Sequence, residues 1–322
     1  MKSFAQVMEE TEDGNRNLLL GNGFSQAWNT EIFSYENLLE KADFGIRNKA
    51  IKGVFEQLGT YDFEAVMQTM ISSVFIAQSF NPYPVFVEGI RRDAQCLKDS
   101  LVTTIARTHP SLPAQVSDNQ YVTTRKVLYE FSSIFTVNYD LLLYWARNKK
   151  DLEPDDFVTD DGFRENRTWV GNETDQNVFF LHGGLHLYDE SGVIKKHAYT
   201  GGGETIINQV RKNLAKNKFP IFVAEPDPIK KLDRILHNPY LNFCYESLGN
   251  ISNSLVIYGH SMDETDAHIF EKASHGNIEN VYVSIFGDPN SKSNRKTKSS
   301  AESYFHSCKV HFYQAESVLL WK

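Results

Sequence analysis

Short apolar runs that end in small or polar residues recur along the chain. Three of them share this form: Leu18–Leu20 before Gly21-Asn22-Gly23, Ile134–Val137 before Asn138-Tyr139-Asp140, and Val178–Leu181 before His182-Gly183-Gly184. Runs of this length and composition are typical of buried β-strands. In open α/β sheets, ligands bind outside the carboxyl ends of the strands. The pattern therefore predicts three strands whose ends contribute to one site.

Helical and strand patterns alternate through the second half of the chain. The further strands expected are Phe219–Glu225, Ser254–Ser261, Asn280–Gly287 and Val310–Tyr313, and the helices between them include Leu141–Arg147, Tyr240–Leu248 and one that begins at Asp263 to Asp266 and contains His268. Strands that alternate with helices predict an α/β fold with a parallel sheet covered by helices on both faces.

Residues 30–126 have a helical texture and form an expected insertion after the first strand. Apolar residues recur at three- and four-residue spacing in Tyr35–Ala42 and in Asp62–Met70, where Asp62 is a plausible N-cap. Asn81–Pro84 breaks the pattern and Val85–Arg107 resumes it. We expect this block to lie over the site, with its Met and Phe side chains in the core. No linker or repeat divides residues 1–322, which predicts a single domain.

Composition and charge exclude several classes of protein. The chain of 322 residues is 41% hydrophobic and 23% charged, as in ordinary globular proteins. A net charge of −8 disfavours nucleic acid as a direct partner, because such proteins need clustered Lys and Arg. The one basic run, Lys292–Lys298, is expected to be a solvated loop.

No stretch has the roughly 18 apolar residues that a membrane span requires, and the N-terminus lacks the apolar core of a signal peptide. Cys96, Cys244 and Cys308 are too far apart for a disulfide framework or for paired zinc ligands. We therefore expect a cytoplasmic protein without a membrane partner.

Gly21-Asn22-Gly23 is half of a dinucleotide-binding fingerprint. Glycines at this position permit positive φ and a close approach of backbone N–H groups to a phosphate. Gln26 stands where the third glycine of the fingerprint would be, and no acidic residue ends a strand about 20 residues later. An ordinary strand-to-helix turn is the alternative interpretation.

Asn138, Asp140 and His182 are the candidate catalytic side chains. Asn138 and Asp140 are two residues apart and so lie on one side of an extended chain. An Asx turn that caps the next helix is the alternative. His182 has space beside it because two glycines follow, whereas His186 lacks Cys or carboxylate partners at metal-ligand spacing, so no metal site is expected. Thr200–Glu204, with three glycines, is expected to be a flexible turn.

Taken together, these motifs resemble the sirtuin-like NAD-hydrolysing family, in particular its prokaryotic branch in antiphage defence. The residues that carry the resemblance are Gly21–Ser25, Thr136–Asp140, His182-Gly183 and Gly259-His260-Ser261 with Asp266 and His268. The resemblance implies a Rossmann-like core and an NAD+ glycohydrolase that releases nicotinamide and ADP-ribose, with NAD as substrate and no metal. It also implies an abortive-infection effector that is activated by a partner protein or a signal.

The resemblance implies a role for each matching residue. Asn138 would orient the ribose or a water, His182 would accept a proton, and Asp140 would hold the carboxamide of nicotinamide or the loop itself. It implies that Gly21, Asn22, Gly23 and Ser25 contact the pyrophosphate and that Gly259, Ser261 and Asp266 line the adenosine side. Phe24, Gly183 and His260 complete the cofactor-binding residues that it implies.

Two other functions stay open. True sirtuin deacylases carry a four-cysteine zinc ribbon, and the chain has no CxxC pair, which counts against a deacylase. An ADP-ribosyltransferase would instead transfer label from NAD to protein. The third possibility is a non-catalytic nucleotide-binding sensor or assembly subunit. Since the chain shows no appended sensor domain, the expected partners are a separate sensor or activator protein, further copies of the chain, or both.

Overall fold

The computed structural model describes residues 1–33, 38–61, 63–80, 83–107, 109–110, 112–199, 203–223, 225 and 227–322. The expected N-cap Asp62, the start of the helix expected at Tyr35–Ala42, the break at Asn81–Pro82 and most of the glycine turn Thr200–Glu204 lie outside the described residues. No helix in the described part of the chain is long and apolar enough to cross a bilayer.

Six parallel strands form the main sheet, in the order β3-β2-β1-β7-β8-β9. The strands are β1 (Arg16–Leu20), β2 (Ser133–Thr136), β3 (Asn177–Phe180), β7 (Ser252–Tyr258), β8 (Asn277–Ile285) and β9 (Lys309–Gln314). Leu18 of the central strand β1 pairs with Ile134 on one side and Val256 on the other. The parallel sheet expected from the alternating pattern is confirmed.

The order of the strands reverses at β1. The chain continues from β1 to β2 and β3 on one side, and from β7 to β8 and β9 on the other. The connections that follow β1 and β7 therefore lead to opposite ends of the sheet, and in α/β sheets such a switch point is where a ligand crevice forms.

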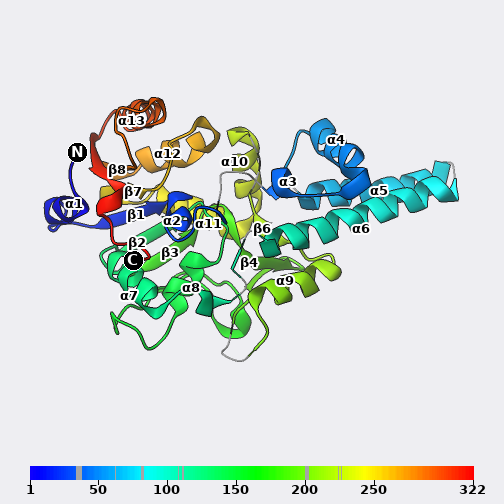
Figure 1. The fold of residues 1–322 in the computed structure, drawn as a ribbon, viewed down its shortest axis with the longest axis horizontal. Helices are drawn as coiled ribbons and strands as arrows, with labels where there is room; N and C mark the ends of the chain where they lie inside the picture. The colour runs from blue at the N-terminus through cyan, green and yellow to red at the C-terminus, as the bar shows by residue number, and fades with distance from the viewer. Residues whose placement is uncertain are drawn as a thin grey trace.

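Helices cover both faces of this sheet (Figure 1). The helices of the main body are α1 (Phe4–Glu10), α2 (Gly23–Gln26), α7 (Asp118–Tyr129), α8 (Leu142–Asn148), α10 (Pro228–His237), α11 (Pro239–Leu248), α12 (Ala267–Ser274) and α13 (Lys292–Tyr304). The connections run in opposite directions from β1, so α7 and α8 lie on one face and α12 and α13 on the other, as the usual right-handed crossovers require.

A second, antiparallel sheet departs from the expected single sheet. It contains β5 (Val193–Lys196), β4 (Gly183–Glu190) and β6 (Pro220–Phe222) in that order, with α9 (Ile206–Ala215) between β5 and β6. The strand expected at Phe219–Glu225 thus exists but belongs to the smaller sheet. The chain leaves the main sheet at Gly183, whose φ is +74°. A Cβ at this position would lie 2.1 Å from the Ile221 carbonyl oxygen, so only glycine fits there.

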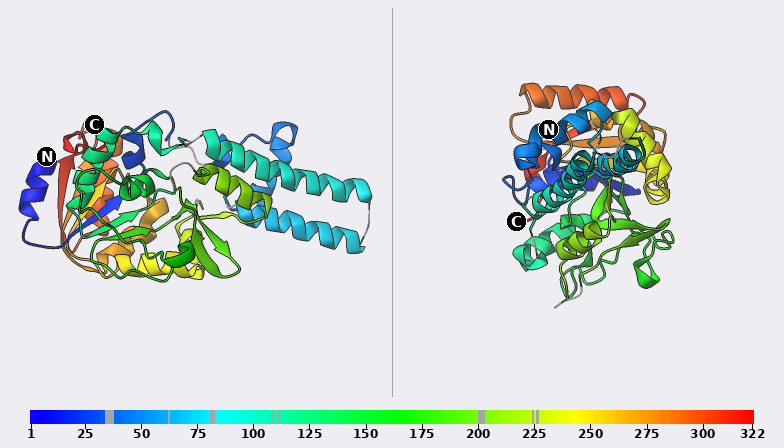
Figure 2. Two further views of the ribbon diagram at one scale, coloured as in Figure 1. Left: turned by 90° about the horizontal axis from the view of Figure 1, so that it is seen from below. Right: turned by 90° about the vertical axis from the view of Figure 1, so that its right-hand side faces the viewer.

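The helical stretch after β1 forms a projecting hairpin. Its helices are α3 (Leu38–Lys41), α4 (Asn48–Leu58), α5 (Phe63–Phe80) and α6 (Pro84–Arg107). The long helices α5 and α6 run side by side, and their far end stands well away from the sheet (Figure 2). In the described part of the chain, α6 contacts α9 of the body, and α3 within the insertion also packs against α6.

The expected loop at Lys292–Lys298 is wrong, because these residues form the first half of α13. Ser291 caps the helix by accepting a hydrogen bond from the Asn294 amide (3.2 Å). Thr297 and Ala301, four residues apart, are buried against the body, and the Thr297 hydroxyl donates to the Ser261 carbonyl (3.0 Å). The N-cap and the one buried stripe stabilise a helix here in spite of the polar composition of the segment.

Candidate functional site

The loops after β1 and β7 touch each other through glycine backbone. The Gly21 amide donates to the Tyr258 carbonyl (2.9 Å), and the Gly23 amide donates to the Gly259 carbonyl (2.8 Å). A Cβ on Gly23 would lie 2.5 Å from the Gly259 Cα, and one on Gly21 would lie 2.6 Å from the Gly259 oxygen. These glycines are needed because the two loops approach so closely.

We expect Gly23→Ala to lower the free energy of unfolding by roughly 1–3 kcal/mol, as overpacking of a rigid site does. Gly53→Ala is the matched control, because Gly53 is inside α4 and a Cβ there meets nothing within 4 Å. It should raise stability by roughly 0.5–1 kcal/mol through helix propensity. Equal melting temperatures for Gly23→Ala and the wild type would contradict the close approach.

Ser25, Asn138 and Asp140 form the first side-chain cluster of the site. The Ser25 hydroxyl donates to the Asp140 carboxylate and accepts a hydrogen bond from Asn138 Nδ2 (3.2 Å). The other Asp140 oxygen accepts from the Leu142 amide at the start of α8 (2.8 Å). Asp140 therefore makes the helix-capping Asx turn that was one of the two interpretations of this triplet, and it also binds the loop after β1.

Asn138 is held so that its amide nitrogen faces the protein. Nδ2 donates to the Gly21 carbonyl (2.9 Å) as well as to Ser25. The backbone amide of Asn138 donates to the Thr136 hydroxyl (3.0 Å), which fixes the loop at the end of β2. Among the described residues, no group donates to the side-chain oxygen of Asn138. That oxygen can accept a hydrogen bond from a hydroxyl or a water of a ligand.

Burial raises the pKa of Asp140 to about 6, although the hydrogen bonds from Ser25 and the Leu142 amide oppose the shift. Because the folded protein holds this proton more tightly than the unfolded chain, the stability that Asp140 contributes is complete below its ordinary pKa near 4 and is lost as pH rises through 6. At neutral pH the buried charge is a liability for the fold.

We expect Asp140→Asn to be more stable than the wild type at pH 8, by at most about 3 kcal/mol, and the difference to vanish near pH 4. The asparagine oxygen can still accept from the Leu142 amide, and its amide nitrogen can donate to the Ser25 hydroxyl, so both contacts are retained with the second one reversed in direction. Denaturant unfolding at the two pH values measures the effect, with the exposed Asp175→Asn as control. A gain that is the same at both pH values would show that ionisation of Asp140 is not its cause.

Asp266 is the centre of the second cluster. Its carboxylate accepts from Lys231 Nζ (2.5 Å), lies 3.2 Å from His260 Nε2, and lies 3.9 Å from His182 Nε2. Burial alone would raise the pKa of Asp266, but the hydrogen bond from His260 and the charge of Lys231 hold it well below its usual range. Asp266 is therefore ionised and paired.

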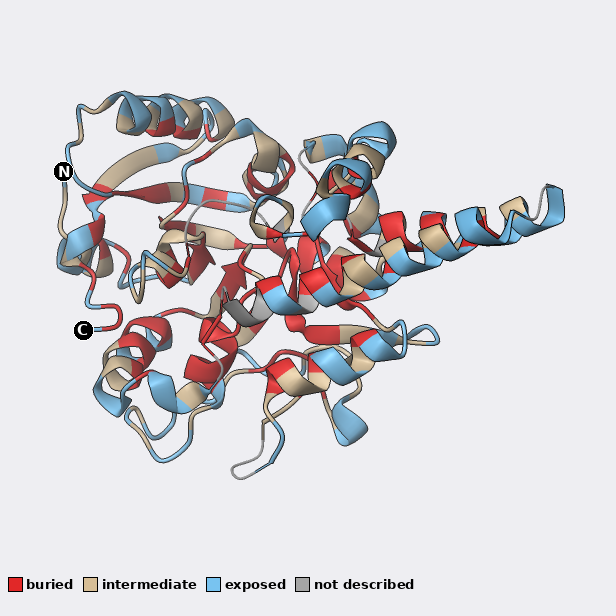
Figure 3. Ribbon diagram, turned by 45° about the vertical axis from the view of Figure 1, so that its right-hand side comes forward, coloured by how far each residue is buried: buried red, intermediate tan, exposed pale blue. Residues whose placement is uncertain are grey.

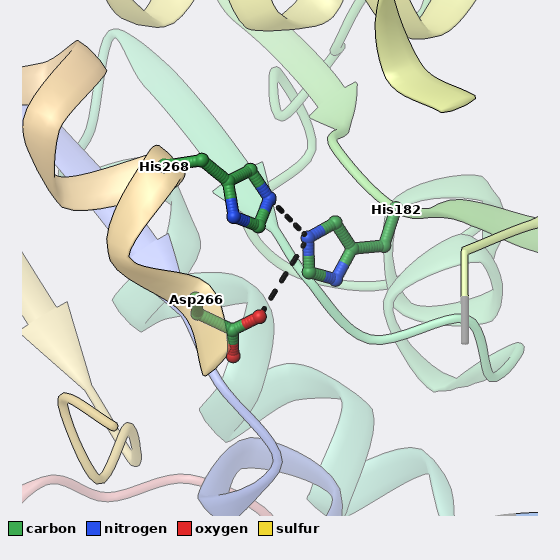
Figure 4. Close-up of side chains that lie close together, drawn as sticks. All are labelled: His182, Asp266 and His268. Atoms are coloured by element: carbon green, nitrogen blue, oxygen red, sulfur yellow. Dashed lines mark hydrogen bonds and ion pairs between the residues drawn. The ribbon is translucent and has the colours of Figure 1, made fainter. Parts of the chain in front are cut away.

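His182 and His268 face each other beside this carboxylate (Figure 4). Their Nε2 atoms are 3.3 Å apart, so one ring donates its proton to the other. Burial lowers the pKa of His182 well below its usual range, and it lowers the pKa of His268 to about 4. Both imidazoles are therefore neutral at physiological pH, and a nitrogen lone pair remains that can accept a proton.

The ligand atoms of His182, Asp266 and His268 all lie within 4.8 Å of one another, so this set could hold a divalent ion. Two imidazoles and a carboxylate are a common ligand set for zinc or iron. Lys231, however, already places a positive charge 2.5 Å from the carboxylate, and a divalent ion would have to displace it. His268 Nδ1 is buried and has no hydrogen-bond partner within the described ranges, whereas a ligating histidine normally donates from its second nitrogen. The site without a metal stays a prediction.

The two clusters are joined through the backbone. The Gly21 carbonyl accepts from Asn138, while the Gly21 Cα packs against His260, since a Cβ on Gly21 would lie 2.8 Å from that of His260. The Leu185 amide donates to the Tyr139 carbonyl (2.8 Å), which joins the loop of Asn138 to the chain after His182. The ends of β1, β2, β3 and β7 therefore meet as the strand-end pattern predicted.

Several expected binding residues make other contacts. The Asn22 side chain donates to the Phe33 carbonyl (3.2 Å). Phe24 is buried against the Trp321 ring (centroids 5.1 Å apart), so its side chain belongs to the core. Ser261 is exposed and its carbonyl accepts from Thr297. The amides of Gly21 and Gly23 and the Ser25 hydroxyl, expected as donors to a pyrophosphate, are bonded within the protein.

His186 lies outside both clusters. It is fully buried in β4 between the rings of Tyr144 and Phe180, with centroids 4.6 and 4.7 Å away. Burial lowers its pKa well below the usual range, and neither ring nitrogen has a partner among the residues that the structure describes.

Lys231 is a buried cation at the candidate site that no sequence motif indicated. It is in α10, which begins after the N-cap Asp227 with Pro228 in the first turn. Lys231 and Ile235 are the buried residues of this helix and are four positions apart. A lysine on the apolar stripe of a predicted helix is the signal that could have identified it, because a buried lysine needs an anionic partner.

A parallel sheet whose loops gather polar side chains at its carboxyl edge defines a Rossmann-like α/β protein. Over residues 18–321 the chain matches the family described as Domain of unknown function (DUF4917), and it belongs to that family. A comparison with curated proteins finds no match.

Proposed function

We propose that the protein is a sirtuin-like NAD+ glycohydrolase that cleaves NAD+ to nicotinamide and ADP-ribose. The observation that carries the proposal is that Asn138, whose amide oxygen is free among the described contacts, and His182, a neutral imidazole, follow the paired ends of the neighbouring strands β2 and β3. An amide acceptor and a neutral imidazole are the groups needed to hold a sugar hydroxyl and to accept a proton from water.

The reaction breaks the bond between C1′ of the ribose and the nitrogen of nicotinamide. The bonding electrons leave with nicotinamide, which departs as a neutral molecule, so no strong general acid is needed. The sugar passes through a state that resembles an oxocarbenium ion, as in glycoside hydrolysis. Water then bonds to C1′ and loses a proton.

In this mechanism Asn138 orients the water or a ribose hydroxyl through its side-chain oxygen. His182 takes the proton that the water loses, and Asp266 stabilises the resulting imidazolium from 3.9 Å. In the resting site the Nε2 atoms of His182 and His268 are joined by one hydrogen bond, so the two rings together accept one proton. Asp140 keeps its role in holding the loops of Ser25 and Asn138 together.

The glycines of the first loop have a different role from the expected one. Their amides hold the loop of β1 against the loop of β7, and the absence of side chains keeps this surface low enough for a dinucleotide to lie across it. The pyrophosphate would then be bound by donors other than the amides of Gly21 and Gly23.

A nucleotide-binding subunit without turnover is the second candidate. It is favoured by the internal engagement of the Ser25 hydroxyl and of both glycine amides, which leaves fewer donors for tight positioning of the substrate. On the effector hypothesis, an activating partner or signal would rearrange this loop, and the chain would deplete NAD+ only then.

The test is incubation of the purified chain with NAD+, alone and together with the products of neighbouring genes, followed by chromatography of nicotinamide and ADP-ribose. Equimolar release of both supports the glycohydrolase. Label transferred from NAD+ to protein would indicate an ADP-ribosyltransferase, and NAD+-dependent loss of acyl groups from a peptide would indicate a deacylase. Binding of NAD+ without nicotinamide release under every condition would favour the non-catalytic subunit.

A further inference from the structure

The far end of the α5–α6 hairpin carries a cluster of large apolar side chains that no described part of the chain covers. We call it the tip cluster; its members are Phe75, Ile76, Phe80, Tyr83, Val85 and Phe86, each between 60% and 86% exposed. The hairpin end stands in solvent, away from the body (Figure 3). Exposed apolar groups on this scale mark interaction sites in soluble proteins.

The core of the hairpin is complete without the tip cluster. Residues on the facing sides of the two helices are buried between them: Val66, Met67, Met70 and Val74 on α5, and Val87, Ala94, Leu97 and Leu101 on α6. The tip cluster lies outside this stripe. Packing within the hairpin therefore does not explain why these positions are apolar.

We propose that the tip cluster is a homodimer interface, in which the hairpin ends of two copies of this chain pack against each other. The first argument is area. A fully exposed aromatic side chain offers roughly 150–250 Å², so the six residues at their exposed fractions offer on the order of 800 Å². This is about what one partner contributes to an interface of standard size.

The second argument is charge. No charged residue lies between Glu64 and Glu88, and these two flanking residues are both acidic. An isologous interface packs the same patch of the two subunits together, so a charged patch would repel its own copy and an uncharged patch does not. Interfaces with transient partners are about as polar as ordinary protein surface, whereas homodimer interfaces are more apolar.

The third argument is geometry. Two antiparallel helical hairpins that meet along their apolar sides form a four-helix bundle, in which each helix is covered on two sides. The residues of α5 in the tip cluster follow helical spacing, since Ile76 and Phe80 are four positions apart. The proposal does not depend on the reaction proposed above.

Light scattering after size exclusion, from low micromolar to hundred-micromolar concentration, tests the proposal on the full chain. The wild type should have twice the chain mass of 36.8 kDa. Phe80→Asp and Tyr83→Asp should each raise the dimer dissociation constant by roughly 30-fold or more, as expected at a buried anchor. Ile46→Asp is the control, because Ile46 is fully exposed in the same insertion but outside the tip cluster, and it should leave the dimer intact.

Three results would overturn the proposal. A wild type that is monomeric at every concentration excludes it, and co-sedimentation of that monomer with phosphatidylcholine vesicles would assign the tip cluster to a membrane instead. A dimer that both tip variants leave unchanged would place the interface elsewhere. Loss of the dimer in Ile46→Asp as well would show that any added charge in the insertion has this effect. Far-UV circular dichroism of each variant verifies that the helices are retained.

Discussion

His182→Ala is expected to lower the rate of nicotinamide release by roughly 10²–10⁴-fold, the usual contribution of a positioned proton acceptor. Asn138→Ala should cause a loss of similar size, because the water or the ribose hydroxyl would no longer be held. Both side chains are more than nine-tenths buried, so each variant is first compared with the wild type by thermal unfolding. Rates measured well below the melting temperature then report on chemistry alone.

His237→Ala is the control for this prediction, because His237 is exposed near the end of α10. It should retain the wild-type rate. The pH profile separates the roles further: since the pKa of His182 is well below its usual range, its protonation causes no loss of rate near pH 6.5. An acidic limb near pH 6 would belong to Asp140 and should disappear in Asp140→Asn. Wild-type rates in both His182→Ala and Asn138→Ala would exclude the proposed mechanism.

The ends of the parallel strands could be predicted because a local pattern determines them. An apolar run such as Leu18–Leu20 can be buried only in a sheet with both faces covered, and the polar residues after it must lie at an edge. Parallel strands bring these edges together, so Asn138 and His182 could be expected at one place from their positions relative to each strand, whereas Asp266 was expected there only from the family resemblance. The sequence alone, however, does not assign the pairs within that place.

Which side chains of the site pair with one another depends on three-dimensional distances that the sequence pattern does not contain. For Asp140 the pattern left a ligand contact and a loop-holding Asx turn open, and the structure shows it bonded to Ser25 and to the start of α8. His260 and Lys231 share Asp266, which no pattern indicated. The second sheet was missed for a related reason. A short apolar strand has the same composition whether its partner is parallel or antiparallel, and the change of direction depends on the single backbone conformation of Gly183.

Helix α10 connects the candidate site to the helical insertion. Lys230 donates to the Gly59 carbonyl at the end of α4, while the next residue, Lys231, binds Asp266. Helix α10 thus contacts the insertion with one lysine and the site with the next. Replacing Lys230 and Lys231 one at a time therefore compares the loss of a surface contact with the loss of a contact at the centre of the site.

Lys231→Met should lower the free energy of unfolding by about 3–5 kcal/mol, because it leaves the buried Asp266 carboxylate without its cation. The side chains of the pair are only 11% and 15% exposed, so water cannot replace the ammonium fully. Methionine fills a similar volume, which limits the loss to the charge. Lys230→Met is the neighbouring control, and because Lys230 is exposed its loss should change stability by no more than roughly 1 kcal/mol.

A double-mutant cycle distinguishes the ion pair from general damage to α10. Asp266→Asn alone leaves the Lys231 ammonium without its carboxylate partner, and it should be nearly as destabilising as Lys231→Met. In the double variant neither charge remains, and the introduced asparagine side chain can still accept a hydrogen bond from His260. The double variant should therefore be more stable than the sum of the two single losses predicts, with a coupling of roughly 1–3 kcal/mol in denaturant unfolding. Strict additivity would mean that Lys231 stabilises α10 by packing and not by neutralising Asp266.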